Sequence, residues 1–128
     1  MIHLDTSVLI DVFTGPRRSG LAFREALLEG HGMTFSTIVL FEWRRGARTA
    51  AELADQEALL PEADLVAFDA AAARMAARLY GELRRSRGRE ADLAIAATAI
   101  VNGATLWTLN RDDFADIPGL ELYERASP

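Results

Sequence analysis

The amino-acid sequence predicts an α/β fold in three layers, with helices on both faces of a five-stranded parallel sheet. Five short apolar segments are typical of buried strands, and most are separated by longer segments with apolar residues at helical spacing. Strands that alternate with helices favour parallel pairing through right-handed crossovers. Half of the 128 residues are hydrophobic, which is enough for one core, so we expect a single domain over residues 1–128.

In the first half of the chain, turn and cap residues separate two strands from four helices. A short apolar segment stops at Asp5, and apolar residues then recur at helical spacing, so a strand turns directly into a helix. Ser36 or Thr37 and Thr49 can accept a hydrogen bond at a helix start, and glycine or proline ends each helix. The expected elements are, in order, a strand at 2–4, helices at 6–13 and 19–29, a strand at 33–35, and helices from Ser36 or Thr37 to near Gly46 and from Thr49 to about Leu60.

The second half of the chain alternates strands and helices more regularly. Asp69 can cap a long alanine-rich helix, and Gly103 ends another helix that follows a polar break. The expected elements are, in order, a strand at 65–68, a helix from Asp69 to about Arg85, a helix at 90–102, a strand at 105–108, a turn or short helix at 110–114, and a strand at 120–123.

The composition excludes several kinds of chemistry. The chain has no cysteine, and all 14 of its basic residues are arginine, which excludes disulfides, thiolate metal sites and any mechanism that needs lysine. Receiver-type phosphoacceptor domains and haloacid-dehalogenase-like phosphatases are excluded for this reason. A net charge of −5 is unlike that of a non-specific nucleic-acid binder. No segment predicts a signal peptide or a membrane-spanning helix, so we expect a cytoplasmic protein.

Acidic residues stand where elements of the predicted fold begin or end. Asp5 ends the first strand, and Glu42 lies inside the third helix. Asp92 is in the first turn of the helix at 90–102, and Asp112 and Asp113 follow the fourth strand. Each acid has an ordinary alternative role, as a helix cap, a solvated helical residue, a favourable charge at a helix start, or a turn residue.

The acids can meet only if the first and fourth strands are both central, because ligands bind at the carboxyl ends of such strands. Carboxylates that share a small volume repel one another, and a hard cation relieves that repulsion. Carboxylate and water ligands suit Mg²⁺ or Mn²⁺, which would hold a phosphate oxygen and activate a water. The spacing of the residues alone leaves this arrangement and the ordinary roles open.

Four segments of the chain, taken in order, resemble a known family. They are Leu4-Asp5-Thr6-Ser7, Ser36-Thr37 followed by Glu42 and Gly46, Asp92-Leu-Ala-Ile-Ala-Ala-Thr-Ala99, and Thr108-Leu-Asn110-Arg-Asp-Asp113-Phe114. Over nearly its whole length the chain is similar to PIN domains, and specifically to the single-domain toxins of VapC-type toxin–antitoxin pairs. This resemblance implies a PIN-like fold and a metal-dependent endoribonuclease that leaves 5′-phosphate and 3′-hydroxyl ends. It also implies a homodimer and a cognate VapB-like antitoxin that blocks the site.

The resemblance also implies roles for single residues. The catalytic acids around Mg²⁺ would be Asp5, Glu42, Asp92 and Asp113, with the three aspartates as metal ligands and with support from Thr6, Ser7, Asn110 and Asp112. Asp112 competes with Asp113 for the place of the fourth acid, and Asp113 fits better because Phe114 follows it. Ser7 stands where many relatives have asparagine. Trp43 stands where an aliphatic residue is usual, so we expect the surface of the third helix to be specific to this protein.

Arginines near the acids are candidates for contacts with RNA phosphates. Arg44 and Arg45 follow Glu42 and Arg111 precedes Asp112, although each is also compatible with an ordinary solvated charge. A second cluster precedes Asp92 and would form either an RNA-facing lip or a solvated connection: Arg84, Arg85, Arg87 and Arg89. His3, inside the first strand, is expected to pack in the core.

Three other functions are compatible with a PIN-like fold. One is a nuclease that acts outside a toxin–antitoxin pair, and another is a binding module with an inactive site, which the complete set of acids disfavours. The third is a structure-specific DNA nuclease. Such nucleases carry insertions that clamp DNA, and a chain of 128 residues has no room for them.

Overall fold

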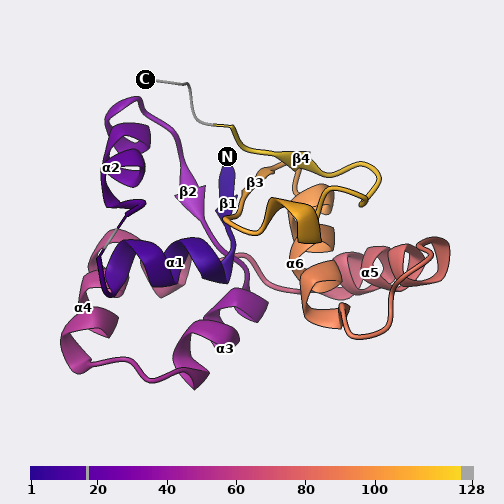
Figure 1. The fold of residues 1–128 in the computed structure, drawn as a ribbon, viewed down its shortest axis with the longest axis horizontal. Coiled ribbons are helices and arrows are strands. Elements are labelled where there is room, and N and C mark those ends of the chain that lie inside the picture. Colours follow the sequence, from indigo (N-terminus) through magenta and orange to yellow (C-terminus); the bar gives the residue numbers. More distant parts are fainter. Residues whose placement is uncertain (17, 125–128) are drawn as a thin grey trace.

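The computed structural model describes residues 1–16 and 18–124, and in it helices flank a parallel sheet (Figure 1). Helices α1 to α4 form one group, and α5 packs along α6 beyond the strands (Figure 1). The elements are, in order, β1 (Ile2–Leu4), α1 (Thr6–Phe13), α2 (Gly20–Leu28), β2 (Met33–Thr34), α3 (Thr37–Arg45), α4 (Ala50–Leu59), the 3₁₀ helix η1 (Glu62–Asp64), α5 (Ala70–Glu82), α6 (Glu90–Val101), β3 (Thr105–Trp107), the 3₁₀ helix η2 (Arg111–Asp113) and β4 (Glu121–Leu122).

The strand order of the sheet is β2-β1-β3-β4, and every pairing is parallel. The two strands that precede candidate site residues, β1 and β3, are therefore neighbours in the middle of the sheet. Their register pairs Leu4 with Trp107. The chain leaves both strands at the same edge of the sheet, and the residues that follow them face each other there. The condition under which the acids can meet, that both strands are central, is therefore fulfilled.

The expectation of a fifth strand over 65–68 is wrong, because the sheet has four strands. That segment contributes only an isolated parallel bridge between Ser36 and Val66. The Val66 amide donates to the Phe35 carbonyl at 3.1 Å, and the Val66 carbonyl accepts from the Thr37 amide at 2.9 Å. Thr37 is already the first residue of α3, so the backbone beside Val66 leaves the sheet after one residue pair. A longer strand therefore cannot form at 65–68.

Two helix boundaries also differ from the sequence-based expectation. Helix α5 ends at Glu82, not near Arg85, because the Ser86 hydroxyl donates to the carbonyls of Tyr80 and Leu83 and so satisfies the helix end. Residues Glu62–Asp64 form a 3₁₀ helix that no pattern predicts. No helix of the described residues is both long enough and apolar enough to cross a bilayer.

Trp43 lies in the core and not on the outer surface of α3. Its side chain is fully buried, and its indole N–H donates to Gln56 Oε1 at 3.1 Å. The Arg48 guanidinium stacks on the ring, 4.4 Å from its centroid. The aromatic side chain that α3 presents to the outside is Phe41, which is 62% exposed.

His3 is in the core, as expected, but it is an unusual core residue. The residue is only 2% exposed, and neither ring nitrogen has a hydrogen-bond partner within the described chain. Burial, with a smaller effect of the N-terminal charge, lowers the pKa of His3 to about 4. The side chain is therefore neutral at physiological pH, and acid conditions would have to place a charge inside the sheet.

Candidate active site

Asp5 follows β1 and occupies the N-cap position of α1, but its side chain makes no capping hydrogen bond. Instead, Oδ2 accepts a hydrogen bond from Ser7 Oγ at 2.7 Å and one from Thr108 Oγ1 at 2.8 Å. The residue is 4% exposed. The alternative role as a simple helix cap is excluded, because two hydroxyls hold this carboxylate at the edge of the sheet.

The two hydroxyls that hold Asp5 are themselves fixed by the backbone after β3. Ser7 Oγ accepts from the Leu109 amide at 3.1 Å, and Thr108 Oγ1 accepts from the Asn110 amide at 3.0 Å. With these backbone donors in place, each hydroxyl hydrogen is directed toward the carboxylate. Ser7 therefore contacts Asp5 directly, whereas Asn110 contacts Thr108 through its backbone amide, and the supporting roles of Ser7 and Asn110 stay predictions.

Thr108 contacts the candidate site, although the sequence analysis assigns it no role. Its position follows from the strand register. Leu4 pairs with Trp107, and Asp5 and Thr108 are the residues that directly follow these two strands. A hydroxyl directly after a central strand is the signal that could have indicated it. From the sequence alone, however, it is not known that β1 and β3 are neighbours, so the hydroxyl cannot be matched with Asp5.

Glu42 is held on α3 and is not a freely solvated helical residue. Its Oε1 accepts a hydrogen bond of 2.6 Å from Thr6 Oγ1 at the start of α1. Its Oε2 lies 3.6 Å from Arg45 Nη2, and the side chain is 18% exposed. Thr6 therefore holds Glu42 by a hydrogen bond, and its supporting role in the site stays a prediction.

Asp92, in the first turn of α6, shows that the acids lie near one another. The pKa of the Asp92 carboxyl is raised to about 6, mainly by burial and then by the charges of Asp5, Asp113 and Glu42 in that order, while Arg89 acts in the opposite direction. A carboxylate that only served the positive end of a helix would have a lowered pKa. Acids from four separate elements thus share one region, and their ionised forms repel one another.

Of the two adjacent acids in η2, Asp113 is the one whose charge acts on Asp92. Both side chains are exposed. The assignment of Asp113 as the fourth acid is therefore favoured over that of Asp112, and it stays a prediction.

The arrangement of the acids suits a cation that keeps part of its water shell. Among the described residues, no three of His, Cys, Asp or Glu are close enough together to hold a metal ion directly. Mg²⁺ does not require such a cage, because it usually binds through one or two carboxylates and retains several waters. The oxygen donors fit Mg²⁺ or Mn²⁺, and the ligand roles of Asp5, Asp92 and Asp113 stay predictions.

The arginines that were candidates for RNA contacts differ in where they lie. Arg45 is beside Glu42, and its guanidinium lies 5.4 Å from the centroid of the Phe41 ring. Arg44 pairs with Glu57 at 3.2 Å, away from the acids. Arg111 pairs with Glu124 at 3.1 Å and donates to the Tyr123 carbonyl, so it holds the C-terminal segment. Arg84, Arg85 and Arg87 are exposed, whereas Arg89 is bonded within the protein.

An apolar groove adjoins the acids on one side. It has a volume of about 590 Å³ and lies between α3, α5 and α6. Phe41, Tyr80 and Leu93 are among its lining residues, and Glu42 and Arg45 lie in its wall. A partner with an apolar side chain could therefore contact this groove and the site acid Glu42 at the same time.

Comparison with known proteins agrees with this architecture. The family model described as PIN domain matches residues 2–120. The chain is 33% identical over 120 residues to the protein named Ribonuclease VapC19 of Mycobacterium tuberculosis, which is 92% of this chain and 95% of that relative. Because the match spans nearly the whole chain, the protein belongs to the PIN domain family, among its VapC members.

Solved structures of VapBC complexes contain a chain with the same fold. A chain in the DNA-bound VapBC from Salmonella typhimurium superposes with a TM-score of 0.78 at 26% identity, and covers 95% of this chain and 96% of that one. A chain in VapBC2 from Rickettsia felis, bound to a DNA fragment from its promoter, gives a TM-score of 0.77 at 27% identity, with 96% and 98% covered. The three-layer fold predicted from the sequence is confirmed.

Proposed function

We propose that the protein is a Mg²⁺-dependent endoribonuclease toxin that hydrolyses RNA phosphodiesters at the acid cluster. The observation that carries this proposal is the position of Asp92, whose carboxyl is affected by the charges of Asp5, Asp113 and Glu42 at one edge of the sheet. A further support is the similarity to a relative that is named a ribonuclease. A binding module with an inactive site does not explain why the acids lie together, and the relative's name favours RNA over DNA as the substrate.

The residues present suit a divalent cation. When bound, Mg²⁺ or Mn²⁺ would supply an activated water and a positive charge that stabilises the developing phosphorane-like transition state. Asp5, Asp92 and Asp113 are the side chains that we assign to hold it. Because their ionised forms repel one another when no cation is bound, cation binding and the ionisation of Asp92 favour each other.

The other side chains of the site orient these acids. The hydroxyls of Ser7 and Thr108 fix Oδ2 of Asp5, which keeps that carboxylate in one rotamer. Thr6 fixes Glu42 in the same way. Arg45 is the arginine that we assign to a phosphate of the RNA, because it lies beside the site acid Glu42, whereas Arg44 and Arg111 pair with Glu57 and Glu124.

The proposed activity is tested by assaying single-stranded RNA and branched DNA side by side, with Mg²⁺, with Mn²⁺ and with a chelator. We expect RNA to be cleaved with either metal and not with chelator, and we expect 5′-phosphate ends. Preferential cleavage of branched DNA would favour a structure-specific DNA nuclease. Binding of RNA without cleavage under every condition would favour a binding module with an inactive site.

We also propose that the protein forms a homodimer and that a cognate VapB-like antitoxin inhibits it. The supports are the VapBC complexes among the similar structures and the apolar groove that adjoins Glu42. A purified VapB-like antitoxin is expected to stop RNA cleavage in proportion to the complex formed. The homodimer predicts a solution mass of about twice the 14.0 kDa of one chain, measured by light scattering.

Replacing Thr108 with valine is expected to lower the rate of RNA cleavage about 10- to 100-fold, because outer hydrogen bonds that orient metal ligands have effects of this size. Valine has nearly the same shape but cannot donate to Asp5. The matched control is Thr105→Val on the same strand, whose hydroxyl makes none of the site's hydrogen bonds. Steady-state cleavage rates of both variants check the prediction, and equal rates would contradict it.

A further inference from the structure

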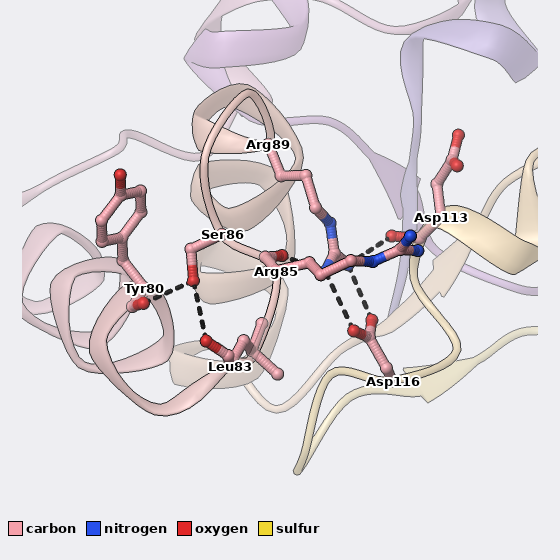
Figure 2. A network of polar contacts seen from close by, with 7 residues as sticks. All are labelled: Tyr80, Leu83, Arg85, Ser86, Arg89, Asp113 and Asp116. Atoms are coloured by element: carbon pink, nitrogen blue, oxygen red, sulfur yellow. Dashed lines mark hydrogen bonds and ion pairs between the residues drawn. The ribbon is translucent and has the colours of Figure 1, made fainter.

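We propose that Arg89 and Asp116 form a clamp that positions Asp113 against Asp92, so that Arg89 is a positioning residue of the site. The inference rests on the proposed nuclease function and deepens it, because it says how the acid from η2 is held beside the acid from α6. Neither residue belongs to the four segments that carry the family resemblance. Figure 2 shows the clamp and the loop that leads into it.

The guanidinium of Arg89 makes four contacts, and the side chain is only 17% exposed. Nη1 and Nη2 donate to the two carboxylate oxygens of Asp116 at 2.9 and 2.7 Å. Nη1 also donates to the Arg85 carbonyl at 2.7 Å, and Nη2 donates to the Asp113 carbonyl at 2.9 Å (Figure 2). The fork geometry of arginine permits this set, and a lysine ammonium could not reproduce it.

These contacts join the two segments that carry the acids. Arg89 is the N-cap residue of α6, three residues before Asp92, and Asp113 is the last residue of η2. The carbonyl of Asp113 is bound to Arg89, while its carboxylate points away from the guanidinium (Figure 2). The clamp therefore fixes the backbone of Asp113 and leaves its carboxylate available to the site.

The loop on the other side of the clamp is also fixed. Ser86, which is buried, donates to the carbonyls of Tyr80 and Leu83 and closes the end of α5 (Figure 2). The Arg85 carbonyl then receives a hydrogen bond from Arg89. Arg89 is thus held both by the Arg85 carbonyl of the preceding loop and by Asp116. It can therefore act as a rigid connection between α6 and η2.

The clamp differs from the other ion pairs of the surface. The Arg78–Glu82 pair on α5 is a single contact of 3.7 Å between side chains that are mostly exposed. Pairs of that kind contribute little, because solvent screens them and both side chains lose freedom. A two-pronged pair with two extra hydrogen bonds to backbone has a defined geometry, which is what a positioning role requires. The hypothesis that Arg89 belongs to an RNA-facing lip is therefore not supported, since its donors are occupied within the protein.

The test compares Asp116→Asn and Arg89→Lys with the control Glu82→Gln, each in the wild-type background and in an Asp113→Asn background. Two quantities are measured: the affinity for Mn²⁺ alone, by calorimetry, and kcat and KM for RNA cleavage. Asp116→Asn changes the net charge and Arg89→Lys does not, so an effect common to both is not an effect of net charge. The carboxylate of Asp116 is exposed, so its replacement leaves the core untouched.

We expect both clamp variants to lower kcat about 10-fold and Mn²⁺ affinity several-fold, with KM nearly unchanged and Glu82→Gln like wild type. In the Asp113→Asn background the clamp variants should have no further effect, because the two changes act through the same group. Undiminished losses in that background, or no losses in either, would overturn the clamp while the nuclease function stands. Absence of both RNA cleavage and Mn²⁺ binding in the wild type would overturn the proposed function and the clamp with it.

Discussion

Asp92→Ala is expected to lose RNA cleavage by a factor of at least about 1,000, which corresponds to about 4 kcal/mol of transition-state stabilisation. Asp92 lies among the charges of Asp5, Asp113 and Glu42. Removal of its carboxylate takes away a ligand that we assign to the cation, and with it the charge that positions the activated water. The measurement is the single-turnover rate of RNA cleavage at saturating Mg²⁺.

The matched control for Asp92→Ala is Glu90→Ala, an exposed acid in the same turn of α6. We expect the control to cleave RNA at the wild-type rate. Calorimetry with Mn²⁺ adds a second measurement, in which Asp92→Ala should bind the ion much more weakly than the control. Unchanged affinity would mean that Asp92 is not a ligand, whatever its effect on the rate.

Loss of activity in Asp92→Ala should not arise from unfolding. The folded-state pKa of Asp92 is about 6, above its ordinary value of 3.8. The folded protein therefore binds the Asp92 proton more tightly than the unfolded chain does, and its stability falls as the pH rises through this interval. At neutral pH without metal the ionised carboxylate opposes folding, so the variant should unfold at a temperature equal to or higher than that of the wild type.

His3→Leu is expected to make the protein more resistant to acid. The folded-state pKa of His3 is about 4, whereas the ordinary pKa of a histidine is 6.5. The unfolded chain therefore binds a proton that the folded protein does not, and stability falls as the pH decreases from 6.5 toward 4. The lost stability reaches about 3 kcal/mol near pH 4. Leucine removes this loss, and it also removes two buried nitrogens that lack partners within the described chain.

Urea unfolding at pH 7.5 and pH 4.5 measures this effect of His3. The wild type should lose more free energy of unfolding between the two pH values than His3→Leu does, by about 2–3 kcal/mol. His31→Gln is the control, because the side chain of His31 is 44% exposed. A control that shifted as much as His3→Leu would show that the acid sensitivity does not come from the buried histidine.

The sequence was sufficient to predict most of the fold, because its signals are local. Apolar spacing and cap residues locate the helices within a few residues, and the alternation of helices and strands predicts the parallel sheet. The prediction of a strand at 65–68 was wrong because strand formation there depends on residues that are distant in the sequence. Whether Val66 has a strand partner depends on Thr37, which already begins α3.

The site was predictable in part. Asp5, Glu42, Asp92 and Asp113 were indicated by their places in elements and by the family resemblance, and the structure brings their charges together. Thr108 and Arg89 were not assigned roles in the site, because a hydroxyl or an arginine gains such a role only through partners that are far away in the sequence. Arg44 and Arg111 were candidates for RNA contacts, but each is paired with a glutamate 13 residues further along the chain, and the sequence does not indicate these pairs.

The pairing of the first strand with a late one affects when the site can form. One of the two hydroxyls that hold Asp5 lies 103 positions further along the chain, so a ribosome-bound chain that ends before β3 can hold this acid only through the hydroxyl of Ser7. Asp113 is made later still. Because β1 and β3 form the centre of the sheet, the unfinished protein also lacks most of its strand pairing. The site that we propose for RNA cleavage would therefore stay incomplete until synthesis of the chain is nearly finished.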